Sequence, residues 1–139
     1  MCQESEVPQE IVVSQDVCDP ERMTEMGVEI CRAIQAVKAE ILPNREIQCP
    51  EDFARGWCRH IATEVYQALG EPDDVRIMRG GTMGGHHLWI KHNGRHFDAE
   101  RPCGVDEYQE LPFVRRLGSL LGEPKDKTEE VMYAVRHSA

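Results

Sequence analysis

The chain has 139 residues, a length typical of one domain with one core, and 40% of its residues are hydrophobic. Acidic residues outnumber basic ones by 25 to 16, which gives a formal net charge of −9. This charge argues against binding to nucleic acid or to an anionic membrane, because both need a basic surface. The sequence has no apolar run of the roughly 20 residues that span a bilayer, and its N-terminus is too polar for a secretory signal. We therefore expect a cytoplasmic protein.

The six cysteines form no CxxC pair, so the commonest zinc and redox signatures are missing from the sequence. Without an export signal, and in a chain long enough to fold unaided, we expect reduced thiols. The cysteines are Cys2, Cys18, Cys31, Cys49, Cys58 and Cys103.

The N-terminal part of the chain predicts an arm followed by a helix. Residues 1–18 carry little pattern and are expected to form the arm, while residues 19–139 are expected to form a single α+β domain. Asp19 and Pro20 are typical of a helix start, and Pro43 of a helix end, which predicts a helix over 20–41. Its apolar residues recur at steps of three and four: Met23, Met26, Ile30, Ile34, Val37 and Ile41. This face packs on the domain core or, as an alternative, forms the seam of a homodimer.

Further elements follow in chain order. We predict a second helix over 53–69, with Gly70 just beyond its end, and a strand over 75–80. The glycines of the next segment predict a flexible loop over 80–85. The stretch 108–122 is expected to be partly helical, and the tail 128–139 is either a short helix or a last strand.

A β-hairpin is predicted over 87–99, because Asn93-Gly94 is a strong signal for a two-residue turn. Pro102 and Gly104 are expected to break the chain after its second strand. The turn sets a register in which Ile90 lies opposite Phe97 and Trp89 opposite Asp98. Because side chains alternate along a strand, one face is apolar and belongs against the core: Leu88, Ile90, Phe97 and Ala99.

The opposite face of the hairpin carries most of its titratable side chains. It holds His87, Trp89, Lys91, His96 and Asp98. His87 lies diagonal to Asp98, and diagonal neighbours have Cα atoms about 7–8 Å apart, which these side chains can bridge. The register therefore lets Asp98 bind one nitrogen of His87 and leaves the other for a nucleophile.

Cys58 is the candidate nucleophile. A free thiol has a pKa near 8.5, which a helix N-terminus or a nearby imidazolium lowers. Gly56 lies just upstream, where a tight bend lets a helix begin near Trp57, and backbone N–H groups there can hold a developing oxyanion. The alternative is an inert buried thiol, because free cysteine is among the most buried residue types.

Together these segments resemble a known family. GWC at 56–58, the helix that follows it, HLWI at 87–90 and GRHFDAE at 94–100 are similar to the transglutaminase-like branch of the papain-like cysteine proteins. The resemblance covers about residues 53–113. It implies that Cys58, His87 and Asp98 are nucleophile, base and orienting acid. It also implies that the Cys58 helix and the N-terminal helix pack on a small antiparallel sheet. The stretch 99–113 is similar to small bacterial and phage proteins of this superfamily.

These residues lead us to expect an enzyme that acts on a peptide, amide or thioester substrate, without metal or cofactor. Trp57, Trp89 and His96 are the candidate substrate-binding residues. Hydrolysis and acyl transfer both stay open. Two other classes also stay open. One is a non-enzymatic binding or inhibitor protein on the same scaffold. The other is a zinc domain with ligands among Cys58, His60, His86, His87, His92, His96 and Cys103.

Overall fold

The structure of the protein is a computed structural model in which residues 23–43, 56–82, 85–117 and 122–137 are described. A five-stranded antiparallel sheet has the order β4-β3-β2-β1-β5. The strands are β1 (Val75–Thr82), β2 (Gly85–His92), β3 (Arg95–Asp98), β4 (Arg101–Val105) and β5 (Lys125–Asp126). The helices are α2 (Glu25–Ile41), α3 (Cys58–Ala68), η3 (Tyr108–Glu110), α4 (Pro112–Leu117) and α5 (Thr128–Arg136).

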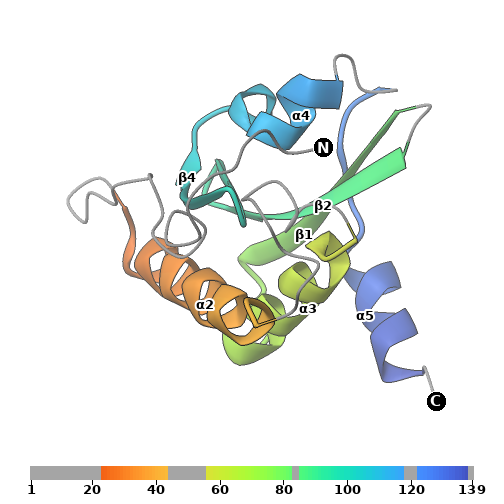
Figure 1. The fold of residues 1–139 in the computed structure, drawn as a ribbon. Coiled ribbons are helices and arrows are strands. Elements are labelled where there is room, and N and C mark those ends of the chain that lie inside the picture. The colour runs from red at the N-terminus through yellow and green to blue at the C-terminus, as the bar shows by residue number, and fades with distance from the viewer. Residues whose placement is uncertain (1–22, 44–55, 83–84, 118–121, 138–139) are drawn as a thin grey trace.

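Helices α2 and α3 lie on one face of the sheet and α4 lies on the other (Figure 1). This confirms the α+β class and the antiparallel sheet. The papain-like core stays a prediction, and the predicted arm over 1–18 lies outside the described residues.

Helix α2 begins later than predicted. Thr24 is its N-cap, and the Thr24 hydroxyl accepts a hydrogen bond from the backbone N–H of Gly27 at 2.8 Å. This bond satisfies one of the N–H groups that a helix start leaves unpaired, so the helix starts there. The proposed cap at Asp19 lies outside the described residues. The predicted core face is confirmed, because Ile30, Ile34, Val37 and Ile41 are buried.

Helix α3 begins at Cys58, not at residue 53. Gly56 has φ +83°, a conformation that glycine adopts without a Cβ clash, and Trp57 is the N-cap. Residues 53–55 lie outside the described part of the chain. The tight bend at Gly56 therefore places the cysteine in the first turn of the helix.

The glycine-rich segment forms strands where a loop was predicted. Gly80 pairs with His87 and Gly81 pairs with His86, so β1 and β2 form a long hairpin. The prediction of a loop was wrong for residues 80–82 and 85, because ladder hydrogen bonds come from the backbone and need no side chain, and residues 83–84 lie outside the described part of the chain. As a result both histidines lie within a paired strand.

Strand β4 was not predicted, because Pro102 and Gly104 suggested a break. An edge strand tolerates proline, since one side of it makes no ladder bonds. Gly104 has φ +86°, and a Cβ there would lie 2.8 Å from the ring of Phe97. Glycine at this position thus lets β4 pack tightly beside β3.

Each face of the sheet covers its own core, as the predicted hairpin faces require. The apolar hairpin face (Leu88, Ile90, Phe97 and Ala99) packs with α2, α3 and α5. On the other face, Met78 and Trp89 pack with Leu111 and Val114 beneath η3 and α4.

The C-terminal segment is helical and is held against β1. The Arg76 guanidinium donates to Asp126 and to Glu129, both at 2.7 Å. The backbone N–H of Ile77 donates to the hydroxyl of Thr128, also at 2.7 Å. These contacts fix α5 beside the sheet, where it also contacts α3.

The cysteines differ in state. Cys58 carries a free thiol, and the sulfur atoms of Cys31 and Cys103 lie 3.6 Å apart. Cys103 is disulfide-bonded, so the prediction of reduced thiols was wrong for this residue. Cys103 is 4% exposed in β4, and sequence spacing does not show which sulfur atoms the fold brings together.

Candidate active site

Cys58 is the first residue of α3 and is half-buried at the sheet. The N-cap Trp57 makes no side-chain capping bond, and the first intrahelical bond runs from the N–H of Ile61 to the carbonyl of Trp57. The N–H groups before Ile61 therefore have no intrahelical partner, and they give the helix start its partial positive charge.

His87 and Asp98 form a buried pair. His87 Nε2 lies 2.9 Å from Asp98 Oδ2, and the two residues are 1% and 5% exposed. The other carboxylate oxygen of Asp98 accepts the backbone N–H groups of Glu100 and Arg101 at 3.0 and 2.9 Å. An ionised carboxylate only accepts hydrogen bonds, so Nε2 is the donor and carries a proton. The predicted diagonal contact is confirmed.

Pairing of the hairpin strands stops just before this site. The register Ile90–Phe97, Lys91–His96 and His92–Arg95 is as predicted, but the ladder ends at Ile90 and Phe97. The predicted pairing of Trp89 with Asp98 does not form.

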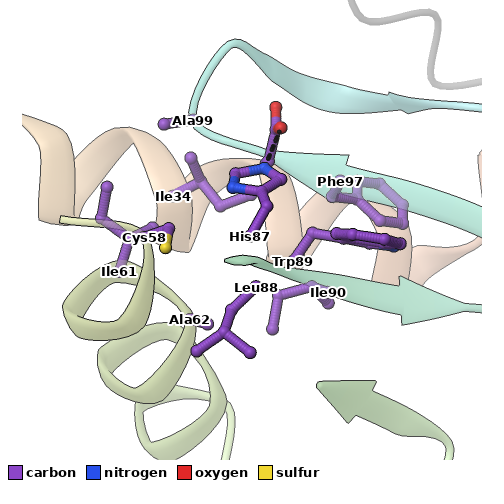
Figure 2. Close-up of a pocket in the computed structure, with 11 residues that line it drawn as sticks. Ile34, Cys58, Ile61, Ala62, His87, Leu88, Trp89, Ile90, Phe97 and Ala99 are labelled. Carbon is purple, nitrogen blue, oxygen red and sulfur yellow. Dashed lines mark hydrogen bonds and ion pairs between the residues drawn. The ribbon is translucent and has the colours of Figure 1, made fainter. Parts of the chain in front are cut away.

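The start of α3 lies next to this unpaired end of the hairpin. Cys58 lines a small void with residues of α2, α3, β2 and β3 (Figure 2). The same end of the hairpin therefore brings together the cysteine, the histidine and the carboxylate.

The second nitrogen of His87 is available for chemistry. His87 Nδ1 is buried and has no hydrogen-bond partner among the described residues. Figure 2 shows this nitrogen on the side of the ring that faces Cys58. A base that is oriented through one nitrogen and directed at a thiol through the other is the arrangement that activates a cysteine.

The pKa values of Cys58 and His87 are shifted in the directions that favour an ion pair between them. Burial alone would raise the pKa of Cys58. The imidazole of His87 and the backbone N–H groups of Leu88 and Arg59 outweigh it and lower that pKa. Burial likewise opposes the charged form of His87, but Asp98 and Cys58 raise the pKa of His87 to about 9. Both shifts lie in the direction that favours a thiolate beside an imidazolium.

The imidazole of His87 is held between two aromatic rings. The ring of Phe113, from α4, lies 4.5 Å from it, and the ring of Trp89 lies 5.6 Å from it. The guanidinium of Arg116 covers Phe113 at 5.4 Å. No sequence pattern places α4 against β2, so the contact of Phe113 with His87 could not be predicted.

The structure places the predicted substrate-binding residues as follows. Trp89 and His96 are 1% and 7% exposed, and the Trp89 indole N–H donates to His96 Nδ1 at 3.0 Å. Both rings also lie near Tyr108, at 6.2 and 6.0 Å. Trp57 is half-buried and its ring lies 5.7 Å from that of His60. Their roles in substrate binding stay predictions.

The possible zinc ligands are not gathered. Within the described ranges, no three histidine, cysteine or acidic side chains form a group that could hold a metal ion. Instead His87 binds Asp98, His96 binds Trp89, and His92 Nε2 lies 2.8 Å from the hydroxyl of Thr24. Each imidazole therefore has a separate partner.

Comparison of the chain with protein-family models, with curated proteins and with solved structures found no match. Among the described helices, none combines the length and the apolar character needed to cross a membrane. A function therefore has to be inferred from the geometry around Cys58.

Proposed function

We propose that the protein is a cysteine-dependent enzyme of acyl chemistry, an amidase, peptidase or acyl transferase with a papain-like or transglutaminase-like site. One observation carries the proposal. His87 is bonded to Asp98 through Nε2 and faces Cys58 with a buried Nδ1 that has no other partner in the described chain.

In the first half of the reaction, the thiolate of Cys58 attacks the carbonyl carbon of an amide, ester or thioester. A carbon–sulfur bond forms, and the carbonyl electrons move to the oxygen. When the tetrahedral intermediate collapses, the leaving group departs with the proton from His87 Nδ1, and an acyl-thioester remains on Cys58.

In the second half, water or an amine attacks the thioester. His87, now neutral, takes a proton from this nucleophile, and the carbon–sulfur bond breaks to restore the thiolate. Asp98 holds the proton on Nε2 throughout, so Nδ1 is always the nitrogen that exchanges protons.

The oxyanion is assigned to the start of α3. The N–H groups of Cys58, Arg59 and His60 precede the first intrahelical bond, which begins at Ile61. Donors of this kind stabilise charge that develops on a carbonyl oxygen.

The test is to trap the acyl-enzyme. The protein is mixed with p-nitrophenyl acetate, quenched in acid, and analysed by peptide mass spectrometry. We expect acetyl on Cys58, a burst of nitrophenol matching the number of sites, and loss of both in Cys58→Ala and His87→Ala. His92→Gln is the control, because this buried histidine lies on the same strand, β2, but its Nε2 lies 2.8 Å from the hydroxyl of Thr24. If Cys58 acquired no more acetyl than the other cysteines of the chain, the binding-protein alternative would be favoured.

The cellular location stays a prediction. The disulfide of Cys103 is more typical of an oxidising compartment than of the predicted cytoplasm. A homodimer also stays a prediction.

A further inference from the structure

A cavity of about 290 Å³ opens beside Cys58, between the start of α3, the ends of β1 and β2, and α5. Cys58 and Arg59 line it from α3, Arg79 and His86 from the hairpin, and Glu130 from α5. The void that Cys58 shares with the His87–Asp98 pair measures only about 10 Å³. A substrate that reaches the sulfur therefore has room in the larger cavity and not behind the sulfur.

The charge of this cavity differs from that of the chain. The chain carries a formal net charge of −9, yet two guanidinium groups and one carboxylate line the cavity. The carboxylate belongs to Glu130, which is also 3.3 Å from the ammonium group of Lys127. The cavity lining is thus positive by about one charge.

The guanidinium groups of the cavity are not used in ion pairs within the described residues. Four arginines elsewhere in the fold pair with carboxylates: Arg76, Arg95, Arg116 and Arg136. Neither Arg59 nor Arg79 has such a partner in those ranges. Arg79 instead donates to His86 Nε2 at 2.9 Å, which holds its guanidinium at the cavity. A guanidinium has five N–H donors, so this bond leaves donors for a ligand.

We propose that this cavity binds a carboxylate of the substrate, next to the carbonyl that Cys58 attacks. This inference rests on the proposed function. Arginine recognises planar carboxylates through paired hydrogen bonds. A lining with one excess positive charge suits a monoanion, and Glu130 disfavours groups with two negative charges. The substrate class is therefore an acyl compound with a carboxylate near its reacting carbonyl, such as an acidic peptide or a dicarboxylic acid derivative.

Two alkylating agents of almost equal size test the charge preference. Iodoacetate carries a carboxylate where iodoacetamide carries a neutral amide, and with both the thiolate displaces iodide. The rate constant for Cys58 is measured with each reagent by peptide mass spectrometry at pH 7 and constant ionic strength. The ratio of the two rate constants, iodoacetate over iodoacetamide, reports the charge preference independently of thiol reactivity.

The variants should shift this ratio in opposite directions. Arg79→Gln and Arg59→Gln remove a positive charge, and each should lower the ratio about fivefold, the effect expected of one charge at close range in a solvated cavity. Glu130→Gln removes the negative charge and should raise the ratio. Arg115→Gln is the matched control, since this exposed arginine of α4 does not line the cavity, and it should leave the ratio unchanged.

The two proposals can fail separately. If Cys58 reacts with iodoacetamide no faster than an ordinary thiol, the proposed function fails. If Cys58 reacts fast but the three cavity variants keep the wild-type ratio, the thiolate is active and the proposed carboxylate site is wrong. A steeper fall in kcat/KM for nitrophenyl hemisuccinate than for nitrophenyl acetate in Arg79→Gln would give independent support.

Discussion

His87 and His96 are two buried histidines on the same face of the same hairpin. Their surroundings shift the pKa values of the two imidazoles in opposite directions. The two residues are 1% and 7% exposed, so both lose hydration, which disfavours the charged form. His87 faces the carboxylate of Asp98 and the thiol of Cys58, and these partners raise its pKa to about 9. For His96, burial and then the nearby charge of Lys91 lower the pKa to about 4.

The comparison shows that burial alone does not make a functional histidine. The carboxylate partner decides which imidazole is charged at neutral pH, and the position of the thiol decides which one can exchange a proton with a nucleophile. His96 instead accepts a hydrogen bond from the indole N–H of Trp89, which needs a neutral ring. One histidine is thus suited to acid–base chemistry and the other to packing.

The largest expected effect comes from His87→Ala. Without the imidazole, burial is left as the main influence on the pKa of Cys58 and raises it. An ordinary thiol with a pKa near 8.5 is only about 3% thiolate at pH 7, so alkylation by iodoacetamide should slow at least about 30-fold. Acyl transfer should be lost entirely. His96→Gln, measured beside it, should change the alkylation rate less than about threefold, and an equal loss of alkylation in the two variants would contradict the distinction between the histidines.

Asp98→Asn should impair turnover while leaving the fold in place. An asparagine oxygen can still accept the N–H groups of Glu100 and Arg101. Its amide, however, would donate to Nε2 of His87 and move the imidazole proton to Nδ1, which then cannot act as a base. Ester turnover should fall roughly a hundredfold, the usual size of a general acid–base contribution. Wild-type turnover with an unchanged circular-dichroism spectrum would rule out the orienting role of Asp98.

Acid should destabilise the protein through His96. The folded-state pKa of about 4 lies below the ordinary value of 6.5. Between these values the unfolded chain binds the extra proton, so the free energy of unfolding falls as the pH drops from 6.5 to 4. In His96→Gln the free energy of unfolding should fall less between pH 7 and pH 4, by about 3 kcal/mol. Urea titrations at the two pH values measure it, and parallel curves for wild type and variant would contradict a buried neutral His96.

The Cys58–His87 pair should give no comparable slope near neutral pH. A thiolate–imidazolium pair binds one proton in total. Between the ordinary pKa values of histidine and cysteine, the two groups of the unfolded chain also bind one proton in total. The free energy of unfolding should therefore change little through this pair between about pH 6.5 and 8.5.

The smallest expected effect concerns Lys91, the cross-strand neighbour of His96. Removing its charge in Lys91→Met should raise the pKa of His96 toward its ordinary value. The shift should be modest because burial is the larger cause. An NMR titration of the ring protons measures it, with His87 as the internal reference, and a lower His96 pKa would contradict the assigned role of Lys91.

Local sequence patterns were enough to predict the core of the site. The Asn93-Gly94 turn fixes the register up to Ile90 and Phe97, and the alternation of side chains along each strand then directs His87 and Asp98 to the same face, where they meet. The bend at Gly56 likewise fixes the start of the helix that carries the cysteine. Both features depend on residues that are close in the sequence, so they can be predicted from a single sequence.

Tertiary features of the site were missed. Strand β4 forms despite Pro102 and Gly104, because the sheet offers an edge that tolerates both. The contact of the Phe113 ring with His87 and the cavity lined by Arg59 and Arg79 depend on where α4 and α5 pack. No periodicity in the sequence specifies these positions.

The most direct test is the pH dependence of iodoacetamide labelling of Cys58 in the wild-type chain and in His87→Ala, resolved by peptide mass spectrometry between pH 5 and pH 9. If Cys58 is already paired with the imidazolium of His87, its rate in the wild-type chain should be nearly level across neutral pH, while its rate in His87→Ala rises steeply. A Cys58 rate that climbs tenfold per pH unit from 6 to 8, as for an isolated thiol, would contradict the ion pair.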